Sequence, residues 1–182
     1  LLFKLNLLNG INISDFNAVY FCYLLLVLII FNLFNQFYLG DSGAYLLGLL
    51  MGYILIKTHD ANPYISPYFI VLLLWYPCFE NLFSIIRKFK FGKSPVYPDN
   101  KHFHQLLFHF FKKKSKLSNL ACNNYSSITI NIYNFFVLFI GSYSIYNTQL
   151  LIILILINIL FYIITYFKLL RFKYKLLISD EK

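Results

Sequence analysis

Acidic side chains are scarce in this sequence. Its 182 residues include 7 Asp and Glu against 16 Lys and Arg, and charged residues make up only 13% of the chain. Soluble globular domains carry about 25% charged residues, so this composition argues against one. A hydrophobic content of 59% and a mean hydropathy of +0.64 indicate an integral membrane protein instead.

Cysteine is also rare, and the three cysteines stand far apart at positions 22, 78 and 122. This spacing argues against a disulfide framework or a pair of neighbouring metal ligands. We interpret the cysteines as small apolar side chains. The sequence does not begin with Met and shows no signal-peptide layout, so we expect it to be the C-terminal part of a longer protein.

Five apolar runs make up much of the sequence. A spanning helix needs about 20 mainly apolar residues, and the runs 20–37, 68–86, 128–146 and 150–167 reach or approach that length. The run 44–56 is shorter, but the small residues before it would lengthen a helix there. The pattern predicts an all-α fold, a polytopic transmembrane helix bundle with about five spanning helices. We expect residues 1–182 to form a single integral membrane domain.

Basic residues are concentrated on one side of the predicted bundle. Nine of the 16 lie between the runs 68–86 and 128–146, and five follow the last run, 150–167. By the positive-inside rule, the loop 87–127 and the C-terminal tail face the cytoplasm. The net charge of +9 then reflects topology and contact with anionic lipid headgroups, and we expect no nucleic-acid partner.

The stretch "LGDSGAYLLG", residues 39–48, places a carboxylate between two apolar runs. Alternation of the spans puts this stretch at the cytoplasmic surface. Asp41 stands at a predicted helix start, where free N–H groups and the positive end of the helix favour anions such as phosphate. Gly43 lets a ligand approach the backbone closely, and the carboxylate of Asp41 can hold Mg2+ together with substrate phosphates. The alternative is that Asp41 only caps the helix.

A second polar cluster lies in "GKSPVYPDNKHFHQLL", residues 92–107, where Asp99, Lys101, His102 and His104 fall within six positions. No further ligands follow at zinc spacing, so we do not expect a zinc site. Histidines beside lysine suit binding of anionic oxygens, or proton transfer near neutral pH. A solvated basic loop is the alternative.

Glu80 lies inside an apolar run. Ionisable residues at such depth are expensive in a membrane and usually face a bundle interior or a cavity. The carboxylate could pair with Asn81 or with a neighbouring helix, or it could take a direct part in catalysis. His59 and His109 lie outside these clusters, and we assign them no role.

Two segments together resemble one enzyme family. "FNLFNQFYLGDSGAYLLG" resembles the FN…(F/L)(M/L)GD-x-G-(S/A) segment of the polyprenyl-phosphate N-acetylhexosamine-1-phosphate transferases, which belong to glycosyltransferase family 4. "YPCFENLFSIIRKFKFGKSPVYPDNKHFHQLL" resembles that family's P-x-x-(D/E)…G-x-SP-x-x-PD-x-x-H-x-HH-LL segment. Both occur in the family's order, within residues 31–107.

The resemblance implies a multi-pass enzyme of the plasma (inner) membrane whose active face is cytoplasmic. Family members use Mg2+, with Mn2+ as the alternative ion. They transfer a sugar-1-phosphate from a UDP-sugar, such as UDP-N-acetylglucosamine, to undecaprenyl or another polyprenyl phosphate, and they release UMP. The product starts cell-surface polysaccharides such as the O-antigen of lipopolysaccharide or a cell-wall glycan. The oligomeric state stays open, with a homodimer as one alternative.

The resemblance also assigns residues. Asp41 matches the metal-associated aspartate of GD-x-G, and His102 and His104 match the first two histidines of H-x-HH, so these three form the expected catalytic set. Arg87 and Lys88 match a basic pair, and Asp99 matches the aspartate of the PD pair. The expected substrate-binding residues are Gly43, Arg87, Lys88, Asp99, Lys101 and Gln105.

The sequence departs from the family pattern at two places. Gln105 replaces the last histidine of H-x-HH, and a glutamine cannot carry a proton at neutral pH. The family's upstream DD-x-x-D/N motif is absent from this chain, so we expect this piece alone to be inactive. Asn9, Asn12 and Asp15 fit an N-x-x-N-x-x-D motif of the family, but one span would place them opposite Asp41, so we interpret 9–15 as an outer loop.

Other functions compete with this interpretation. Within the same superfamily the alternative is a phospho-N-acetylmuramoyl-pentapeptide transferase, although the SPxxPDxxHxH loop favours the amino-sugar branch. A non-enzymatic membrane protein is the second alternative. It would be a transporter piece in which Glu80 lines a path, or an inactive scaffold.

The charge asymmetry yields a test of topology. A cysteine introduced at Ser115 should be protected from a membrane-impermeant thiol reagent added outside intact cells, whereas one at Asn62 should be labelled. The expected pattern follows from the basic residues on the side of 87–127. Labelling of Ser115→Cys combined with protection of Asn62→Cys would reverse the predicted orientation.

Overall fold

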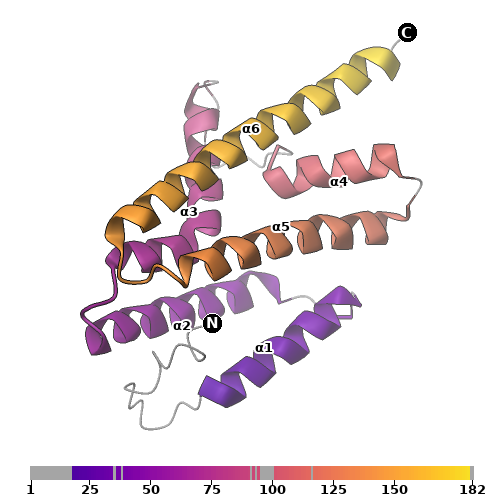
Figure 1. The fold of residues 1–182 in the computed structure, drawn as a ribbon. Helices are drawn as coiled ribbons and strands as arrows, with labels where there is room; N and C mark the ends of the chain where they lie inside the picture. Colours follow the sequence, from indigo (N-terminus) through magenta and orange to yellow (C-terminus); the bar gives the residue numbers. More distant parts are fainter. Residues whose placement is uncertain are drawn as a thin grey trace. The chain divides into compact units, whose positions relative to one another are not determined.

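The computed structural model describes residues 18–34, 36–37, 39–90, 92, 94, 101–115 and 117–180. This described part of the chain contains helices and no strand (Figure 1), which confirms the predicted all-α class. The helices are α1 (Ala18–Leu33), α2 (Gly40–Ala61), α3 (Pro67–Lys90), α4 (Phe103–Lys114), α5 (Asn119–Gly141) and α6 (Thr148–Asp180).

The five predicted runs all fall on helices, but their ends differ. α2 begins at Gly40, so the small residues before the short apolar run do extend it. α5 begins at Asn119, where the Ser118 side chain accepts a hydrogen bond from the Ala121 N–H (3.2 Å), and it ends at Gly141 rather than at 146. α6 continues to Asp180, through basic residues that we predicted as a tail.

The segment 87–127, predicted as a cytoplasmic loop between two spans, contains the helix α4, which we did not predict. Its apolar residues Phe103, Leu106, Leu107 and Phe110 recur at the spacing of one helix face. Leu106 and Leu107 are buried. The lysines 112–114 stand in its last turn, where cations interact favourably with the helix dipole.

Two helices of the described part are long and apolar enough to cross a membrane. They are Pro67–Lys90 and Thr148–Tyr174, and Tyr23–Leu33 is a shorter apolar helix. Large apolar side chains on α3, α5 and α6 are also exposed, among them Leu82, Phe135 and Leu160. Exposed apolar surface on this scale suits lipid better than water. These features support a membrane protein, and the count of five spanning helices stays a prediction.

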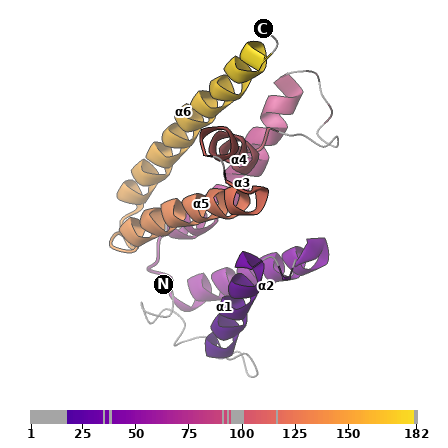
Figure 2. The ribbon, with the colours of Figure 1, turned by 90° about the vertical axis from the view of Figure 1, so that its right-hand side faces the viewer.

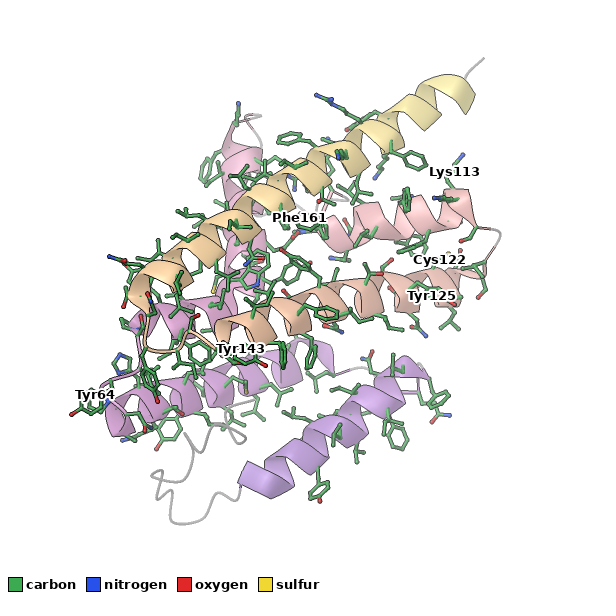
Figure 3. The ribbon with its side chains drawn as sticks, in the orientation of Figure 1. Tyr64, Lys113, Cys122, Tyr125, Tyr143 and Phe161 are labelled. Atoms are coloured by element: carbon green, nitrogen blue, oxygen red, sulfur yellow. The ribbon has the colours of Figure 1, made fainter. Side chains whose placement is uncertain are left out.

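The chain divides into two compact units, residues 1–67 and 68–182, which are described separately. The first contains α1 and α2. In the second, α4 lies between α5 and α6 and packs against both (Figures 1 and 2). Figure 3 shows Cys122, which is fully buried, on α5 next to α4. The single membrane domain predicted for residues 1–182 stays a prediction.

The helix α3 is bent in its middle (Figure 1), and Pro77 lies inside it. Proline has no N–H to donate to the carbonyl one turn earlier, and its ring pushes against that turn. α3 ends near Gly92, whose φ of +64° is a backbone conformation that favours glycine. Pro77 lies three residues before Glu80.

The C-terminal end of α5 packs very closely on α3. A Cβ atom added at Gly141 would lie 2.3 Å from Leu72 Cδ2. Leu72 is fully buried, so its side chain has little room to move. Gly141 is therefore a glycine because the two helices approach each other closely there.

This contact predicts that Gly141→Ala destabilises the second unit. Overpacking a filled core typically costs about 1–3 kcal/mol, so we expect a lower thermal unfolding midpoint in detergent. Ser127→Ala, at an exposed position of the same helix, is the control and should leave the midpoint unchanged. An unchanged midpoint for Gly141→Ala would show that Leu72 repacks without cost.

Candidate active site

The carboxylate of Glu80 joins three helices of the second unit. Its Oε1 lies 3.2 Å from His102 Nδ1 and accepts a hydrogen bond from the Phe103 N–H (3.0 Å). Its Oε2 accepts a hydrogen bond from the Tyr162 hydroxyl. Glu80 thus links α3 to the start of α4 and to α6. Of the two pairings that the sequence left open for Glu80, with Asn81 or with a neighbouring helix, the structure shows the second.

The position of Glu80 explains why it needs several donors. Its side chain is only 12% exposed, and transfer of a carboxylate out of water costs several kcal/mol. Each hydrogen bond to a charged group contributes about 1.5–3 kcal/mol, so three donors can offset that penalty. The Phe103 N–H is also one of the unpaired donors at the start of α4, where the helix dipole favours an anion.

The contact with Glu80 draws the histidine segment toward the middle of α3. Glu80 lies ten residues before the end of α3 at Lys90, which corresponds to about 15 Å along a helix. His102 directly precedes α4 and still reaches this carboxylate. The alternative of a solvated basic loop does not fit His102, which contacts α3.

Aromatic rings surround the Glu80 carboxylate. The ring of Tyr162, which is buried, lies 5.1 Å from Phe79, 5.6 Å from Phe83 and 4.9 Å from Phe103 between centroids. These edge-on and tilted contacts come from α3 and α4. They fix the Tyr162 hydroxyl, and through it the orientation of the carboxylate.

Two further tyrosines of α6 hold the cationic residues. The Tyr166 hydroxyl donates to the Lys101 carbonyl (2.9 Å), and the Arg87 guanidinium lies 5.6 Å from the centre of the Tyr166 ring. The Lys101 ammonium lies 5.4 Å from the centre of the Tyr174 ring. Both distances suit cation–π contacts. Arg87, Lys101 and His102 are thereby brought to one side of α6.

Gln105, which we predicted to bind substrate, has a structural partner. Its Oε1 accepts the His102 N–H (3.1 Å), so it satisfies a backbone donor at the start of α4. A glutamine in this position completes half of a capping box. The role of Gln105 in binding substrate stays a prediction.

His104 lines a hollow at the surface of α4. Its ring is nearly parallel to that of His102, with 5.8 Å between centroids. A hollow of about 280 Å³ is lined by His104, Gln105, Phe108, His109 and Asn123. His109, to which we assigned no role, therefore lines the same hollow as His104.

Electrostatics keep both histidines of this hollow neutral. Desolvation of the ring, and next the nearby His102, lower the pKa of His104, while Glu80 opposes this shift. Desolvation also lowers the pKa of His109, with smaller contributions from Lys173 and Lys112. At neutral pH each ring has one donor and one acceptor nitrogen.

Asp41 and Gly43 belong to the first unit. Asp41 is exposed and lies in the first turn of α2, one residue inside the helix. Leu39 occupies the N-cap position, which corrects the alternative that Asp41 is only a cap. Gly40 has a φ of +66°, so the chain enters the helix through a conformation that favours glycine. At Gly43, an added Cβ atom would lie 2.7 Å from the Leu39 side chain.

The structure thus groups some of the predicted residues. Arg87, Lys101, His102 and Gln105 gather where α3, α4 and α6 meet, and His104 follows on α4. Lys88 lies beside Arg87 at the end of α3. Asp99 and residues 9–15 lie outside the described residues. In the described part of the chain, no three His, Cys, Asp or Glu residues form a cluster that could hold a metal ion.

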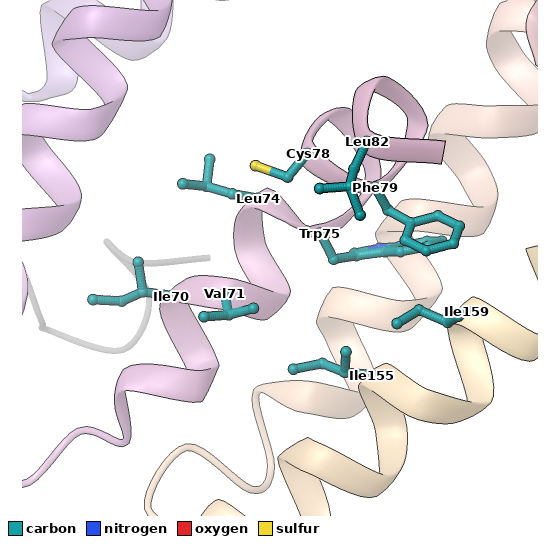
Figure 4. Close-up of a pocket in the computed structure, with 9 residues that line it drawn as sticks. All are labelled: Ile70, Val71, Leu74, Trp75, Cys78, Phe79, Leu82, Ile155 and Ile159. Atoms are coloured by element: carbon teal, nitrogen blue, oxygen red, sulfur yellow. The ribbon is translucent and has the colours of Figure 1, made fainter. Parts of the chain in front are cut away.

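An apolar pocket of about 350 Å³ lies on α3 and α6 (Figure 4). All of its lining residues are apolar: Ile70, Val71, Leu74, Trp75, Cys78, Phe79, Leu82, Ile155 and Ile159. Phe79, at one end of this set, is next to Glu80 in the chain and also touches Tyr162. The pocket therefore adjoins the aromatic rings around the carboxylate.

The sequence interpretation missed Tyr162, Tyr166 and Tyr174. A signal was available, because Asn158, Tyr162 and Tyr166 recur every four residues in the most apolar run. All three are buried. Polar tips at helical spacing inside an apolar helix mark the face that meets other helices rather than lipid.

Comparison with known proteins gives one partial match. No family model and no solved structure matches the chain. The chain is similar to decaprenyl-phosphate N-acetylglucosaminephosphotransferase from Mycolicibacterium smegmatis, at 30% identity. The match covers 40% of this chain and 21% of that protein, so the chain spans about a fifth of the length of the curated relative it matches. The finding supports a relationship to the sugar-phosphate transferases that the two motifs resemble.

The environment of His104 predicts its titration. We expect its midpoint below the ordinary histidine value of 6.5, as followed by NMR of the ring protons. His102→Gln should raise that midpoint because it removes a neighbouring positive charge. Glu80→Gln should lower it further because it removes the opposing negative charge. A wild-type midpoint at or above 6.5 would contradict this description.

Proposed function

We propose that the full-length protein transfers an N-acetylhexosamine-1-phosphate from a UDP-sugar to a polyprenyl phosphate at the cytoplasmic face of the plasma membrane. One observation carries the proposal. The segment that resembles the second family motif folds so that Arg87, Lys101 and His102 lie on one side of α6. The partial match to a decaprenyl-phosphate N-acetylglucosaminephosphotransferase supports the same kind of reaction.

The chemistry needs positive charge and hydrogen-bond donors more than it needs a nucleophilic side chain. An oxygen of the lipid phosphate attacks the β-phosphorus of the UDP-sugar, the bond between that phosphorus and the oxygen of UMP breaks, and UMP leaves. Catalysis of such transfers is mainly positioning and electrostatic stabilisation. Arg87 and Lys101 supply fixed charge, and His102 supplies a ring nitrogen toward the phosphates.

Asp41 is the proposed protein ligand for Mg2+. Its carboxylate is a hard oxygen donor, it is exposed, and it stands in the first turn of α2. Mg2+ commonly binds one or two carboxylates, several waters and substrate phosphates, so a single described carboxylate fits this role, with Mn2+ as the alternative ion. When bound, the ion would supply positive charge beside the diphosphate.

The two hollows of the second unit suit the two substrates. The apolar pocket on α3 and α6 offers an isoprenoid chain a lining without polar groups, and its Phe79 end adjoins Glu80. The hollow beside His104 offers neutral imidazole and amide groups. We assign the polyprenyl chain to the first and the nucleotide side of the UDP-sugar to the second.

The proposal predicts the effect of Asp41→Asn in the full-length protein. Asparagine keeps the shape of the side chain but removes the charge that holds Mg2+. We expect transfer of sugar phosphate to fall by about 100-fold or more, while the protein still inserts and folds. Turnover should be measured at limiting Mg2+ with a UDP-sugar and a polyprenyl phosphate.

Asp60→Asn is the matched control, because Asp60 is the other carboxylate of α2 and stands in its last turn. This variant should transfer sugar phosphate at the wild-type rate. Near-normal turnover of Asp41→Asn at limiting Mg2+ would remove Asp41 from the site.

A further inference from the structure

We infer that Glu80 is a positioning residue, which fixes the tautomer and the ring orientation of His102 for the transfer reaction. The inference rests on the proposed function, because it assigns Glu80 a role in the same site. Glu80 forms hydrogen-bond contacts with His102, Phe103 and Tyr162.

The contact between Glu80 and His102 determines where the proton of the imidazole lies. An ionised carboxylate can only accept hydrogen bonds. With Oε1 at 3.2 Å, His102 Nδ1 must therefore carry the proton. The other ring nitrogen, Nε2, is then an acceptor in the neutral ring and a donor in the protonated ring. Glu80 thus decides which nitrogen of His102 remains for the phosphates.

The ring of His102 cannot easily turn away. Oε1 also accepts the N–H of Phe103, the residue after His102, so the carboxylate grips both the ring and the adjoining backbone. On the other side, the Tyr166 hydroxyl holds the carbonyl of Lys101, the residue before His102 (2.9 Å). The histidine is thereby fixed from α3 and from α6.

Glu80 is itself fixed. Its second oxygen accepts the hydroxyl of Tyr162, and the Tyr162 ring is enclosed by Phe79, Phe83 and Phe103. Among the described side chains of residues 68–174, Glu80 is the one carboxylate. It nevertheless sits among aromatic rings and beside a histidine. This placement suits orientation of an imidazole, the role that a carboxylate plays behind a catalytic histidine.

The test uses Glu80→Gln in the full-length protein with ¹⁵N-labelled histidine. The amide oxygen can still accept from Phe103, so α4 can keep its start, and it can still accept from Nδ1, but the neutral amide binds the Nδ1 proton less strongly than the carboxylate does. Long-range ¹H–¹⁵N spectra, recorded about two pH units above the ordinary histidine pKa, should show the Nδ1–H tautomer of His102 in the wild type. The population of that tautomer should fall in the variant, with His102→Gln used to assign the signal.

Kinetics supply the second readout. We expect kcat and kcat/KM for the UDP-sugar to fall together by roughly 10- to 100-fold in Glu80→Gln, because orientation of His102 matters in the transition state. Tyr133→Phe is the matched control. It removes another tyrosine hydrogen bond to α6, that to Asn158, and it should change neither the tautomer nor kcat.

The outcomes separate the inference from the proposed function. A wild-type His102 that carries its proton on Nε2 overturns the inference, whether or not any variant folds. A Glu80→Gln protein with a lower unfolding midpoint but with wild-type tautomer and kcat also overturns it, since Glu80 would then only cap α4. Absence of sugar-phosphate transfer in the wild type would contradict the proposed function, while the tautomer would still decide the role of Glu80.

Discussion

The second unit depends on one buried carboxylate. Glu80 lies in a helix that is apolar enough to cross a membrane, so its charge is stable only if donors reach it from elsewhere. The donors come from α4 and α6, at sequence separations of 22, 23 and 82 residues. The requirement to satisfy this carboxylate therefore draws the start of α4 against α3 and determines which face of α6 turns inward.

The consequences reach the other residues of the site. Tyr162 must face Glu80, and one helical turn later Tyr166 then faces the Lys101 carbonyl and the Arg87 guanidinium. The backbone of residues 101–105 forms hydrogen bonds with the side chains of Glu80, Tyr166 and Gln105. Arg87 on α3 and the residues Lys101 and His102 just before α4 are thus held by contacts with other helices, which favours a fixed geometry.

Local features of the sequence were enough to predict five of the helices in the described part of the chain. The five apolar runs have helical length, and Gly40 to Gly43 marked the start of α2. α4 was not predicted, because prolines precede it and lysines 112–114 fill its last turn, although Phe103, Leu106 and Phe110 have helical spacing. Hydrophobic periodicity was the better guide there.

The sequence did not predict which residues far apart along the chain contact each other. Nothing local indicates that Glu80 meets His102 rather than Asn81, since the choice depends on the packing of α3 against α4 and α6. We predicted Gln105 as a substrate-binding residue because it replaces a histidine of the motif. It also stands three residues after His102, a spacing that allows its side chain to accept the His102 N–H, as the structure shows.

The proposed reaction transfers a sugar phosphate rather than a sugar. The most direct measurement follows UDP-N-acetylglucosamine labelled with ³²P at the β-phosphate, incubated with the full-length protein and polyprenyl phosphate in vesicles. We expect the label to move to the lipid fraction with release of equal amounts of UMP, and only when the lipid phosphate is present. Release of labelled UDP, or no turnover that depends on the lipid phosphate, would contradict it.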